Sequence, residues 1–203
     1  MQRTLPSALS STVLVCCVAT SSVYGQQPRR PMGEPIASIV DYDAPPATLR
    51  GLFSVVAVVV RGRVVSSSPR RYDLNHGRAM PLTAHDFQID EVFKLDPMAV
   101  PKNASNITVI QHGGTIVDQD GREITGALNE IYKPGQELIV FLNVSPEAGG
   151  FTVAYGPAGG FLIVDKEVSI PQGLQSYAEF GGRPSIPTAT FVQLLRQLAT
   201  TNR

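Results

Sequence analysis

Three histidines are the first side chains to consider for chemistry, because few other residues of this chain form a recognisable reactive set. They are His76, His85 and His112. No two of them have the i, i+4 spacing of ligands on one helix face or the short spacing of a metal-binding pair. His112 ends a predicted strand beside two glycines. We expect ordinary structural positions for all three, with a metal-binding or general-base role as the alternative.

Two aspartates that follow His112 form the other candidate group. The segment Asp118-Gln-Asp120-Gly resembles the first half of a calcium-binding loop, but Arg122 and Asn129 stand where the full loop needs acidic ligands. A polar turn is therefore the expected structure. His112, Asp118 and Asp120 remain weak candidates for a loop site, since a hydrolase or a metal-dependent enzyme could use them if they converged in a concave pocket.

No established catalytic or cofactor-binding motif occurs in the sequence. Gly-x-Ser-x-Gly, the phosphate-binding loop, His-Glu-x-x-His and Gly-x-Gly-x-x-Gly are all absent. We therefore predict no catalytic residue, no cofactor and no metal ligand. The 17 basic and 17 acidic residues balance. The pairs Arg29-Arg30 and Arg70-Arg71 are not interleaved with aromatic residues, so we expect no nucleic-acid partner.

The first 25 residues have the order of a secretory signal peptide. One basic residue, Arg3, precedes the apolar stretch from Val13 to Ala19, and the small residue Gly25 follows. The stretch is much shorter than the roughly 20 residues that a membrane-spanning helix needs. We expect export to the periplasm, the cell surface or the medium, with cleavage before Gln26 and no transmembrane span afterwards.

Both cysteines, Cys16 and Cys17, lie inside this apolar stretch. After cleavage the chain would contain no disulfide, no thiol nucleophile and no zinc site with cysteine ligands. Attachment of a lipid is a minor alternative, because the residue before Cys16 is Val15 rather than a small residue. Three glycosylation triplets begin at Asn103, Asn106 and Asn143, and their use depends on the host, which the sequence leaves open.

The remaining chain divides into three parts by composition. Residues 26–46 contain five prolines and little periodicity, which is typical of a linker or of an arm that lies on a domain. Residues 47–170 contain the predicted strands. Residues 171–203 form a tail that ends in a helix, since Phe191, Leu194, Leu195 and Leu198 share one helical face.

Strand patterns dominate the middle part. The run from Val55 to Ser66 is rich in valine, and Gly62 within it predicts a bulge or a sharp bend. The other predicted elements are a helical turn at 47–52, strands at 82–95, 107–112 and 137–142, a bulge near Glu91 and Val92, and a hairpin of 150–156 with 160–168. Residues 137–142 are apolar on both faces, so we expect a central buried strand there. Residues 67–80 and 115–136 are predicted as long polar loops.

The order of these segments resembles known exported domains. The segments that carry the resemblance are 58–64, 87–94, Gly113-Gly114, 134–142 and 160–164. They are similar to a class of exported bacterial domains of uncharacterised function and, in outline, to the netrin-like module of tissue inhibitors of metalloproteinases. The resemblance covers about residues 47–168 and implies a mainly β fold: a small OB-like barrel of five or six antiparallel strands with a C-terminal amphipathic helix.

One departure limits what the resemblance implies about activity. Netrin-like modules are linked by disulfides, and inhibitors of this kind act through an N-terminal cysteine. The chain without its signal segment has no cysteine. The resemblance therefore implies the barrel and does not imply inhibition of proteases.

Three hypotheses for the function remain. The leading one is a non-enzymatic binding domain that meets a protein or a small ligand outside the cytoplasm, through the loops at 67–80 and 115–136. The second is a cryptic hydrolase or metal-dependent enzyme in the 112–120 region. The third is a structural component of the cell envelope, which would associate with itself.

Overall fold

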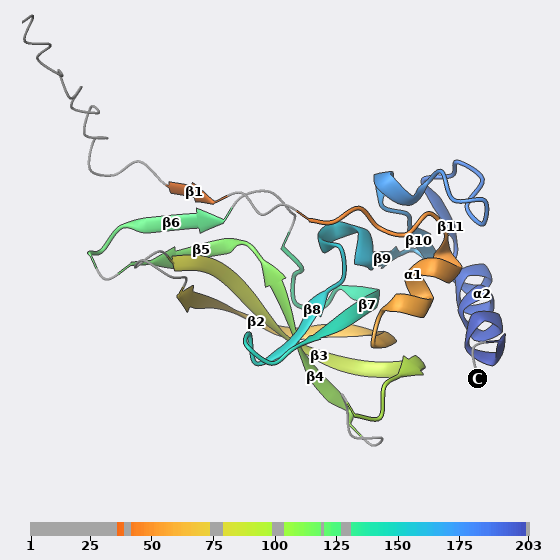
Figure 1. The fold of residues 1–203 in the computed structure, drawn as a ribbon, viewed down its shortest axis with the longest axis horizontal. Coiled ribbons are helices and arrows are strands. Elements are labelled where there is room, and N and C mark those ends of the chain that lie inside the picture. Colours follow the sequence, from red (N-terminus) through yellow and green to blue (C-terminus); the bar gives the residue numbers. More distant parts are fainter. Residues whose placement is uncertain are drawn as a thin grey trace, which may run out of the picture. The chain divides into compact units, whose positions relative to one another are not determined.

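The computed structural model describes residues 36–38, 42–73, 79–98, 104–118, 120–126 and 131–201 (Figure 1). All of them belong to one compact unit, Gly33–Arg203. The predicted signal segment, residues 1–25, lies outside the described residues. The secondary structure is mainly β with a helix at the C-terminal end, as the sequence predicts.

The elements follow one another along the chain in an order dominated by strands. The first half contains β1 (Ile36–Ser38), α1 (Leu49–Val55), β2 (Val58–Asp73), β3 (Ala79–Leu95), β4 (Asn106–His112), β5 (Gly114–Val117) and β6 (Glu123–Gly126). The second half contains β7 (Glu137–Ser145), β8 (Gly150–Val153), η2 (Gly156–Gly159), β9 (Gly160–Val164), β10 (Glu167–Ser169), η3 (Gln172–Leu174), β11 (Ser185–Pro187) and α2 (Thr188–Thr201).

The described strands form two sheets. The larger has eight strands in the order β11-β10-β9-β7-β2-β3-β4-β8, and β8 pairs with β7 as well as with β4. The smaller has three strands in the order β1-β6-β5. Pairing in the larger sheet therefore extends beyond the five or six strands that the sequence predicts, because β9, β10 and β11 continue it past β7.

A long bent hairpin of β2 and β3 is the centre of the larger sheet. Register shifts between Val59 and Val60, at Gly62, and between Val64 and Ser66 agree with the bulges predicted in this region. A Cβ atom at Gly62 would collide with the carbonyl oxygen of Gln88, so only glycine permits this close approach. The prediction of a loop at 67–80 is wrong for its described part: β2 continues to Asp73 and β3 begins at Ala79. Most residues of β2 are exposed here, but they pair with a stretch of β3 that is buried from Pro81 to His85 and that also pairs with β4.

The 115–136 region contains a second hairpin rather than a continuous loop. Strands β5 and β6 pair with each other, and β1 adds to β6 in parallel. Residues 36–38 of the predicted proline-rich arm are thus part of a sheet. In the smaller sheet Ile116 and Ile124 are buried and lie opposite each other, while Val117 and Glu123 are exposed. Segments of four residues are too short for this burial to be recognised in the sequence.

Strand β7 is the buried central strand that the sequence predicts. One of its edges pairs with β2, while its other edge pairs first with β9 at 137–140 and then with β8 at 142–145. The predicted hairpin of 150–156 with 160–168 is therefore wrong. Strands β8 and β9 pair with successive parts of β7, so the glycines at 156 and 159–160 lie in a break between two strands along one edge of β7 and not in a hairpin turn.

Two hydrophobic cores lie on opposite faces of β7. Its even residues, Leu138, Val140 and Leu142, join side chains of β2, β3, β4 and β8 in what we call the inner core. Its odd residues, Ile139 and Phe141, join α1, α2 and the segment from Val168 to Ile186 in the helical core. This division follows from the alternation of side chains along a strand.

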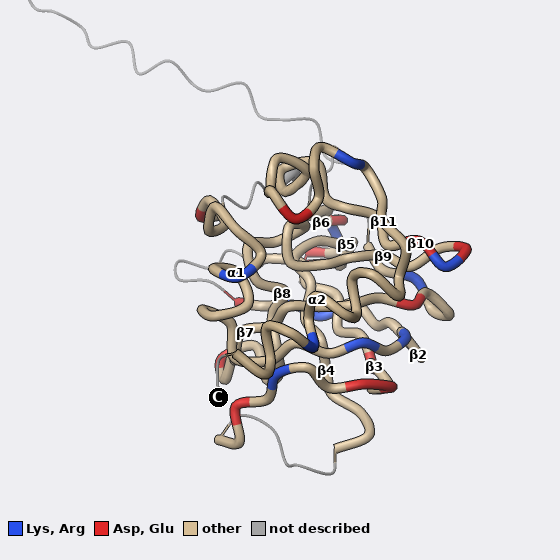
Figure 2. Tube along the Cα trace, turned by 90° about the vertical axis from the view of Figure 1, so that its right-hand side faces the viewer, with Lys and Arg blue, Asp and Glu red and all other residues tan. Residues whose placement is uncertain are grey.

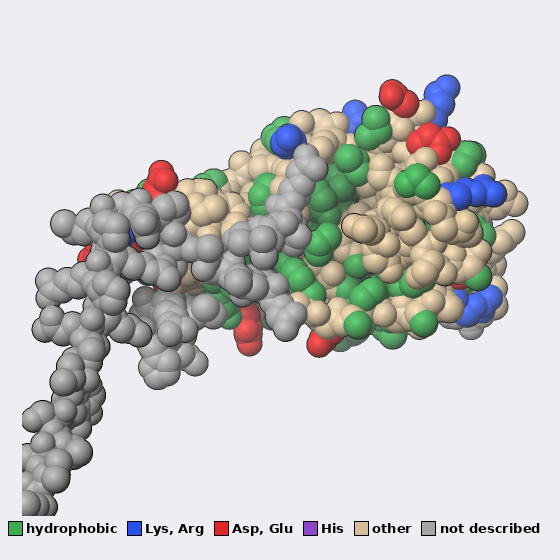
Figure 3. Space-filling model, turned by 90° about the horizontal axis from the view of Figure 1, so that it is seen from above, with side chains coloured by type: hydrophobic (Ala, Val, Ile, Leu, Met, Phe, Trp, Pro, Cys, Tyr) green, Lys and Arg blue, Asp and Glu red, His purple; other side chains and the backbone are tan. Residues whose placement is uncertain are grey.

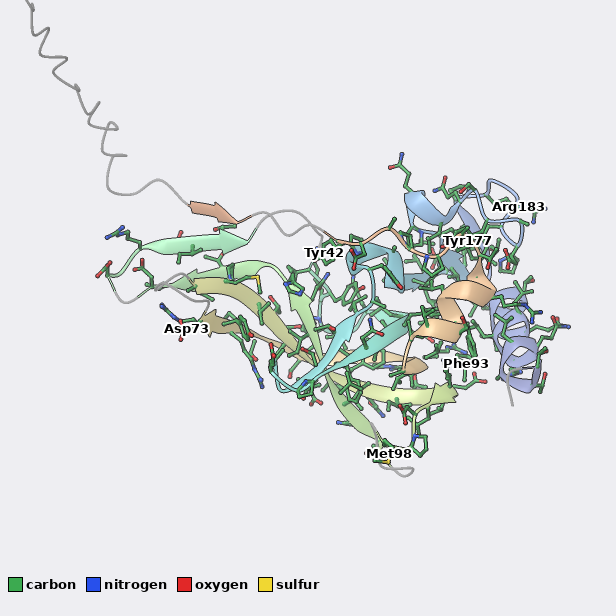
Figure 4. All side chains as sticks on the ribbon, in the orientation of Figure 1. Tyr42, Asp73, Phe93, Met98, Tyr177 and Arg183 are labelled. Atoms are coloured by element: carbon green, nitrogen blue, oxygen red, sulfur yellow. The ribbon has the colours of Figure 1, made fainter. Side chains whose placement is uncertain are left out.

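The two helices close the helical core. Thr48 caps α1 by accepting a hydrogen bond from the amide of Gly51 at 3.0 Å. Helix α2 begins at Thr188 and buries Phe191, Leu195 and Leu198 of the predicted apolar stripe. Val192, which the stripe did not include, is also buried, whereas Leu194 is half-buried. Figure 4 shows Phe93 and Tyr177 at this helical end, whereas Asp73 marks the far end of the long hairpin. No helix within the described ranges is long and apolar enough to cross a membrane.

Candidate functional site: two hollows beside β4

A buried polar network closes one end of the inner core. His85 on β3 is fully buried, and both of its ring nitrogens have partners. Ser67 Oγ lies 2.8 Å from Nδ1, and Gln111 Oε1 lies 3.2 Å from Nε2. The amide of Tyr132 donates to the same Gln111 oxygen at 3.0 Å. Four segments that are distant in sequence thus meet at one polar cluster.

The direction of the hydrogen bonds in this network follows from the backbone amide of Tyr132. An amide N–H can only donate, so the atom of Gln111 that it meets is the oxygen. His85 Nε2 must then donate to this oxygen, which leaves Nδ1 of the neutral imidazole to accept from the Ser67 hydroxyl. Burial lowers the pKa of His85, in agreement with a neutral ring. The network is therefore satisfied without any buried charge.

The first hollow opens in front of this network and has a volume of about 300 Å³. We call it the uncharged hollow, because its lining contains amides, hydroxyls and apolar groups and no ionised side chain. The lining residues are Gln111, Tyr132, Gln136, Pro157, Gly160, Leu162, Ser169, Ile170, Pro171 and Gln172. A lining of this composition suits an uncharged ligand that has hydrogen-bonding groups on an apolar body.

Tyr132 is the best placed polar group of the uncharged hollow. Its hydroxyl lies so close to the backbone of Gly160 that a Cβ atom there would collide with it. Burial raises the pKa of Tyr132, so the hydroxyl stays protonated. No hydrogen bond from this hydroxyl is seen among the described residues, while the backbone amide of the same residue donates to Gln111 Oε1 at 3.0 Å. The hydroxyl thus lies against Gly160, in the wall of the hollow that both residues line.

The second hollow lies on the other side of β4 and has a volume of about 170 Å³. Gln111 and His112 are neighbours on this strand, so their side chains point to opposite faces. We call this one the acidic hollow, after Glu147. Its lining residues are Tyr72, Met80, Leu82, Ile110, His112, Ser145, Glu147, Ala148 and Thr152. The Tyr72 hydroxyl donates to Glu147 Oε2 at 3.1 Å.

His112, one of the residues predicted for a site, lines the acidic hollow. Its Nδ1 is buried without a hydrogen-bond partner among the described residues, and burial lowers its pKa. The ring of Tyr42 meets it edge to face, with centroids 5.8 Å apart; Figure 4 labels Tyr42 near the middle of the molecule. His112 therefore lies in a concave pocket, but its acidic neighbour there is Glu147.

The other two predicted residues, Asp118 and Asp120, lie in the turn between β5 and β6. Asp118 Oδ1 accepts hydrogen bonds from the amides of Asp120 and Arg122, both at 2.8 Å. Asp120 pairs with the guanidinium of Arg122 at 3.0 Å. The polar turn expected from the sequence is observed, and strand β5 separates it from His112. The structure therefore does not bring these three side chains into one hollow.

Sequence reasoning missed Ser67, Gln111 and Tyr132, and it considered His85 only as a histidine in an ordinary structural position. One signal could have identified His85: the alternation of Phe87 and Ile89, extended two residues back along the strand, places it on the apolar face. A polar residue on such a face needs buried partners. These partners come from other strands, so the sequence does not name them.

The arrangement Ser67–His85–Gln111 has the order of a nucleophile, a base and an orienting group. However, neither hollow is lined by Ser67, and His85 is sealed from solvent. We interpret the network as a support for the uncharged hollow. Within the described ranges, no group of three or more His, Cys, Asp or Glu side chains could hold a metal ion.

The sequence matches no protein-family model and no curated protein. The interpretation of both hollows therefore rests on their geometry and chemistry.

Proposed function

We propose that the chain is an exported, non-enzymatic binding domain with an OB-like barrel, and that the uncharged hollow is its ligand site. The observation that carries the site is the supported hydroxyl of Tyr132. A buried network holds the backbone amide of this residue, and the residue lines a hollow without ionised side chains. Preorganised polar groups on an apolar wall are what small-ligand sites require.

The pairing order supports the barrel. Four strands lie in the order β7-β2-β3-β4, in which the fourth strand of the series returns beside the first, as in a Greek key. Strand β8 pairs with β4, the last strand of this series, and also with β7, the first. Each of the five strands therefore has a paired neighbour on both sides. The buried residues of the inner core come from these five strands. The extension β9-β10-β11 would then lie outside the barrel and carry the helical core.

The distribution of charge supports an uncharged partner. Figure 2 shows Lys and Arg interspersed with Asp and Glu on the side that carries α2. In Figure 3 the charged side chains lie mainly at the rim of the visible face, and apolar and uncharged side chains occupy its middle. Such a surface offers no basic track for a nucleic acid.

A titration with N-acetylglucosamine, glucosamine and glucuronate, followed by heteronuclear NMR of the full chain, tests the ligand site. The three probes share a sugar ring and differ in charge. We expect the uncharged probe to shift the resonances of Tyr132, Gln136 and Leu162 with the highest affinity. Tyr132→Phe should weaken it about 3- to 10-fold, the effect of one hydrogen bond to an uncharged group. Tyr72→Phe, in the acidic hollow, is the matched control and should leave it unchanged.

Two results would overturn the ligand site. One is equal affinity for all three probes with shifts scattered over the surface, and the other is a Tyr132→Phe variant that binds as well as the original chain.

Export is tested separately by the mass of the protein recovered from outside the cytoplasm. We expect cleavage between Gly25 and Gln26, and a full-length mass would contradict this part of the proposal.

A further inference from the structure

The acidic hollow combines one carboxylate with uncharged walls. Glu147 is the only acidic side chain in its lining, and no lysine or arginine lines it within the described residues. The hydroxyl of Tyr72 donates to Oε2 of Glu147, so the carboxylate is held at the edge of the hollow. A carboxylate attracts positive charge, so the hollow favours a positively charged group.

The remaining charged groups do not cancel this preference inside the hollow. Burial keeps the imidazole of His112 neutral by lowering its pKa, and the hydrogen bond and charge of Glu147 raise the pKa of Tyr72, so that it stays protonated. The guanidinium of Arg70 lies near Gly149, beside the hollow and outside its lining. The hydroxyls of Ser145 and Thr152 add uncharged acceptors.

The size and the walls of the hollow restrict the ligand further. A volume of about 170 Å³ admits only a molecule of a few heavy atoms. Met80, Leu82 and Ile110 form an apolar wall opposite the polar groups. An apolar tail of a few methylene groups could pack here, and its burial would add to the affinity.

We propose that the acidic hollow binds a small primary amine, whose ammonium group pairs with Glu147 and whose alkyl chain packs on Met80, Leu82 and Ile110. This site is separate from the uncharged hollow, since Gln111 and His112 face opposite sides of β4. Both a free amine and a lysine side chain present this chemistry. The small volume favours the free amine.

Titrations at pH 8 with butylamine, butanol and butyrate test the charge preference, because the three probes share an alkyl chain. NMR shifts at His112 and Thr152 report on the hollow. We expect butylamine to bind at least 10-fold more tightly than butyrate, and Glu147→Gln to remove this difference. The matched control is Glu179→Gln, an exposed acid far along the chain, which should leave the affinity unchanged. Tyr72→Phe keeps the ring and the carboxylate, and should retain binding.

The outcomes separate the proposal from simpler explanations. Equal affinities for butylamine and butyrate, or a Glu147→Gln variant with unchanged preference, would overturn it. Loss of binding in Tyr72→Phe as large as that in Glu147→Gln would overturn it as well, since it would show a structural role for the pair. If a blocked lysine bound more tightly than butylamine, the natural ligand would be a lysine side chain of a polypeptide. This result would contradict the proposal of a free amine.

Discussion

The two sides of β4 differ in how their polar groups are supported. His85, on the side of the uncharged hollow, is fully buried and both ring nitrogens have partners. His112, on the other side, is half-buried, and its Nδ1 has no partner among the described residues. The first histidine joins a hydrogen-bond network between strands. The second lines the wall of a hollow.

The largest effect should come from His85→Ala. The variant creates a cavity and leaves Ser67 and Gln111 without their partner, which should lower the free energy of unfolding by about 3 kcal/mol. The matched change His112→Ala removes no hydrogen bond seen in the described residues and should cost about 1 kcal/mol or less. Urea unfolding of both variants checks the difference. Equal losses in the free energy of unfolding would show that the two histidines contribute equally to stability.

A smaller effect is expected from Gly160→Ala. Its Cβ atom would collide with the Tyr132 hydroxyl, which has to move, so the free energy of unfolding should fall by about 1–2 kcal/mol. Gly173→Ala is the control, because nothing lies within 4 Å of a Cβ atom there. Urea unfolding measures both. If Gly160→Ala were as stable as the control, Tyr132 would not be fixed against β9, and the uncharged hollow would not be preorganised.

The pH dependence of stability should distinguish the histidines from the rest of the chain. Burial lowers the pKa of both His85 and His112 below the ordinary value of 6.5. Above pH 6.5 both rings are neutral in the folded and unfolded states and do not affect stability. Below pH 6.5 the unfolded chain binds protons first, so the free energy of unfolding falls as the pH decreases towards the lowered values.

Urea titrations between pH 8 and pH 5 measure this slope. His85→Gln should remove most of it, because His85 is the more buried ring, and His112→Gln should remove the smaller part. A slope that is the same in the original chain and in His85→Gln would contradict a neutral buried His85. Comparing the two variants thus shows how much of the proton uptake on unfolding is due to His85 and how much to His112.

The smallest effect is expected at Tyr72. The hydrogen bond to Glu147, and then its charge, raise the pKa of Tyr72 above 10.0. Glu147→Gln removes the charge, so the phenol should titrate at a lower pH in an ultraviolet titration. Tyr72→Phe should leave the urea midpoint unchanged, since the pair is exposed. If the pKa of Tyr72 did not change in Glu147→Gln, the two side chains would not interact in solution. This result would count against the amine site proposed in the acidic hollow.

The sequence predicted the elements whose residues carry a strong local signal. A valine-rich run predicted β2, a segment that is apolar on both faces predicted β7, an apolar stripe predicted α2, and Gly62 indicated a bulge. The wrong predictions concern segments whose structure depends on the strands with which they pair. Residues 67–73 have strand geometry only because β3 lies beside them, and β8 and β9 separate because each has a better partner in β7.

The candidate sites were predictable only in part. His112 was identified as a residue to consider, and it does line a hollow. Its proposed partners Asp118 and Asp120 are satisfied within their own turn. Glu147 and Tyr72 are separated from it by long stretches of chain and meet it through strand pairing. The local sequence shows which side chains could react, but it does not show which of them are already occupied by hydrogen bonds within the protein.

By itself, the sequence determined a mainly β domain with a C-terminal amphipathic helix, because alternation and helical periodicity are properties of neighbouring residues. The tertiary structure alone decided which face of β4 each polar residue occupies and what it meets there. Gln111 and His112 are adjacent in the chain, yet one joins a satisfied network and the other a hollow with Glu147. The reason is physical: a strand turns successive side chains to opposite faces, and the strands packed on each face supply the partners.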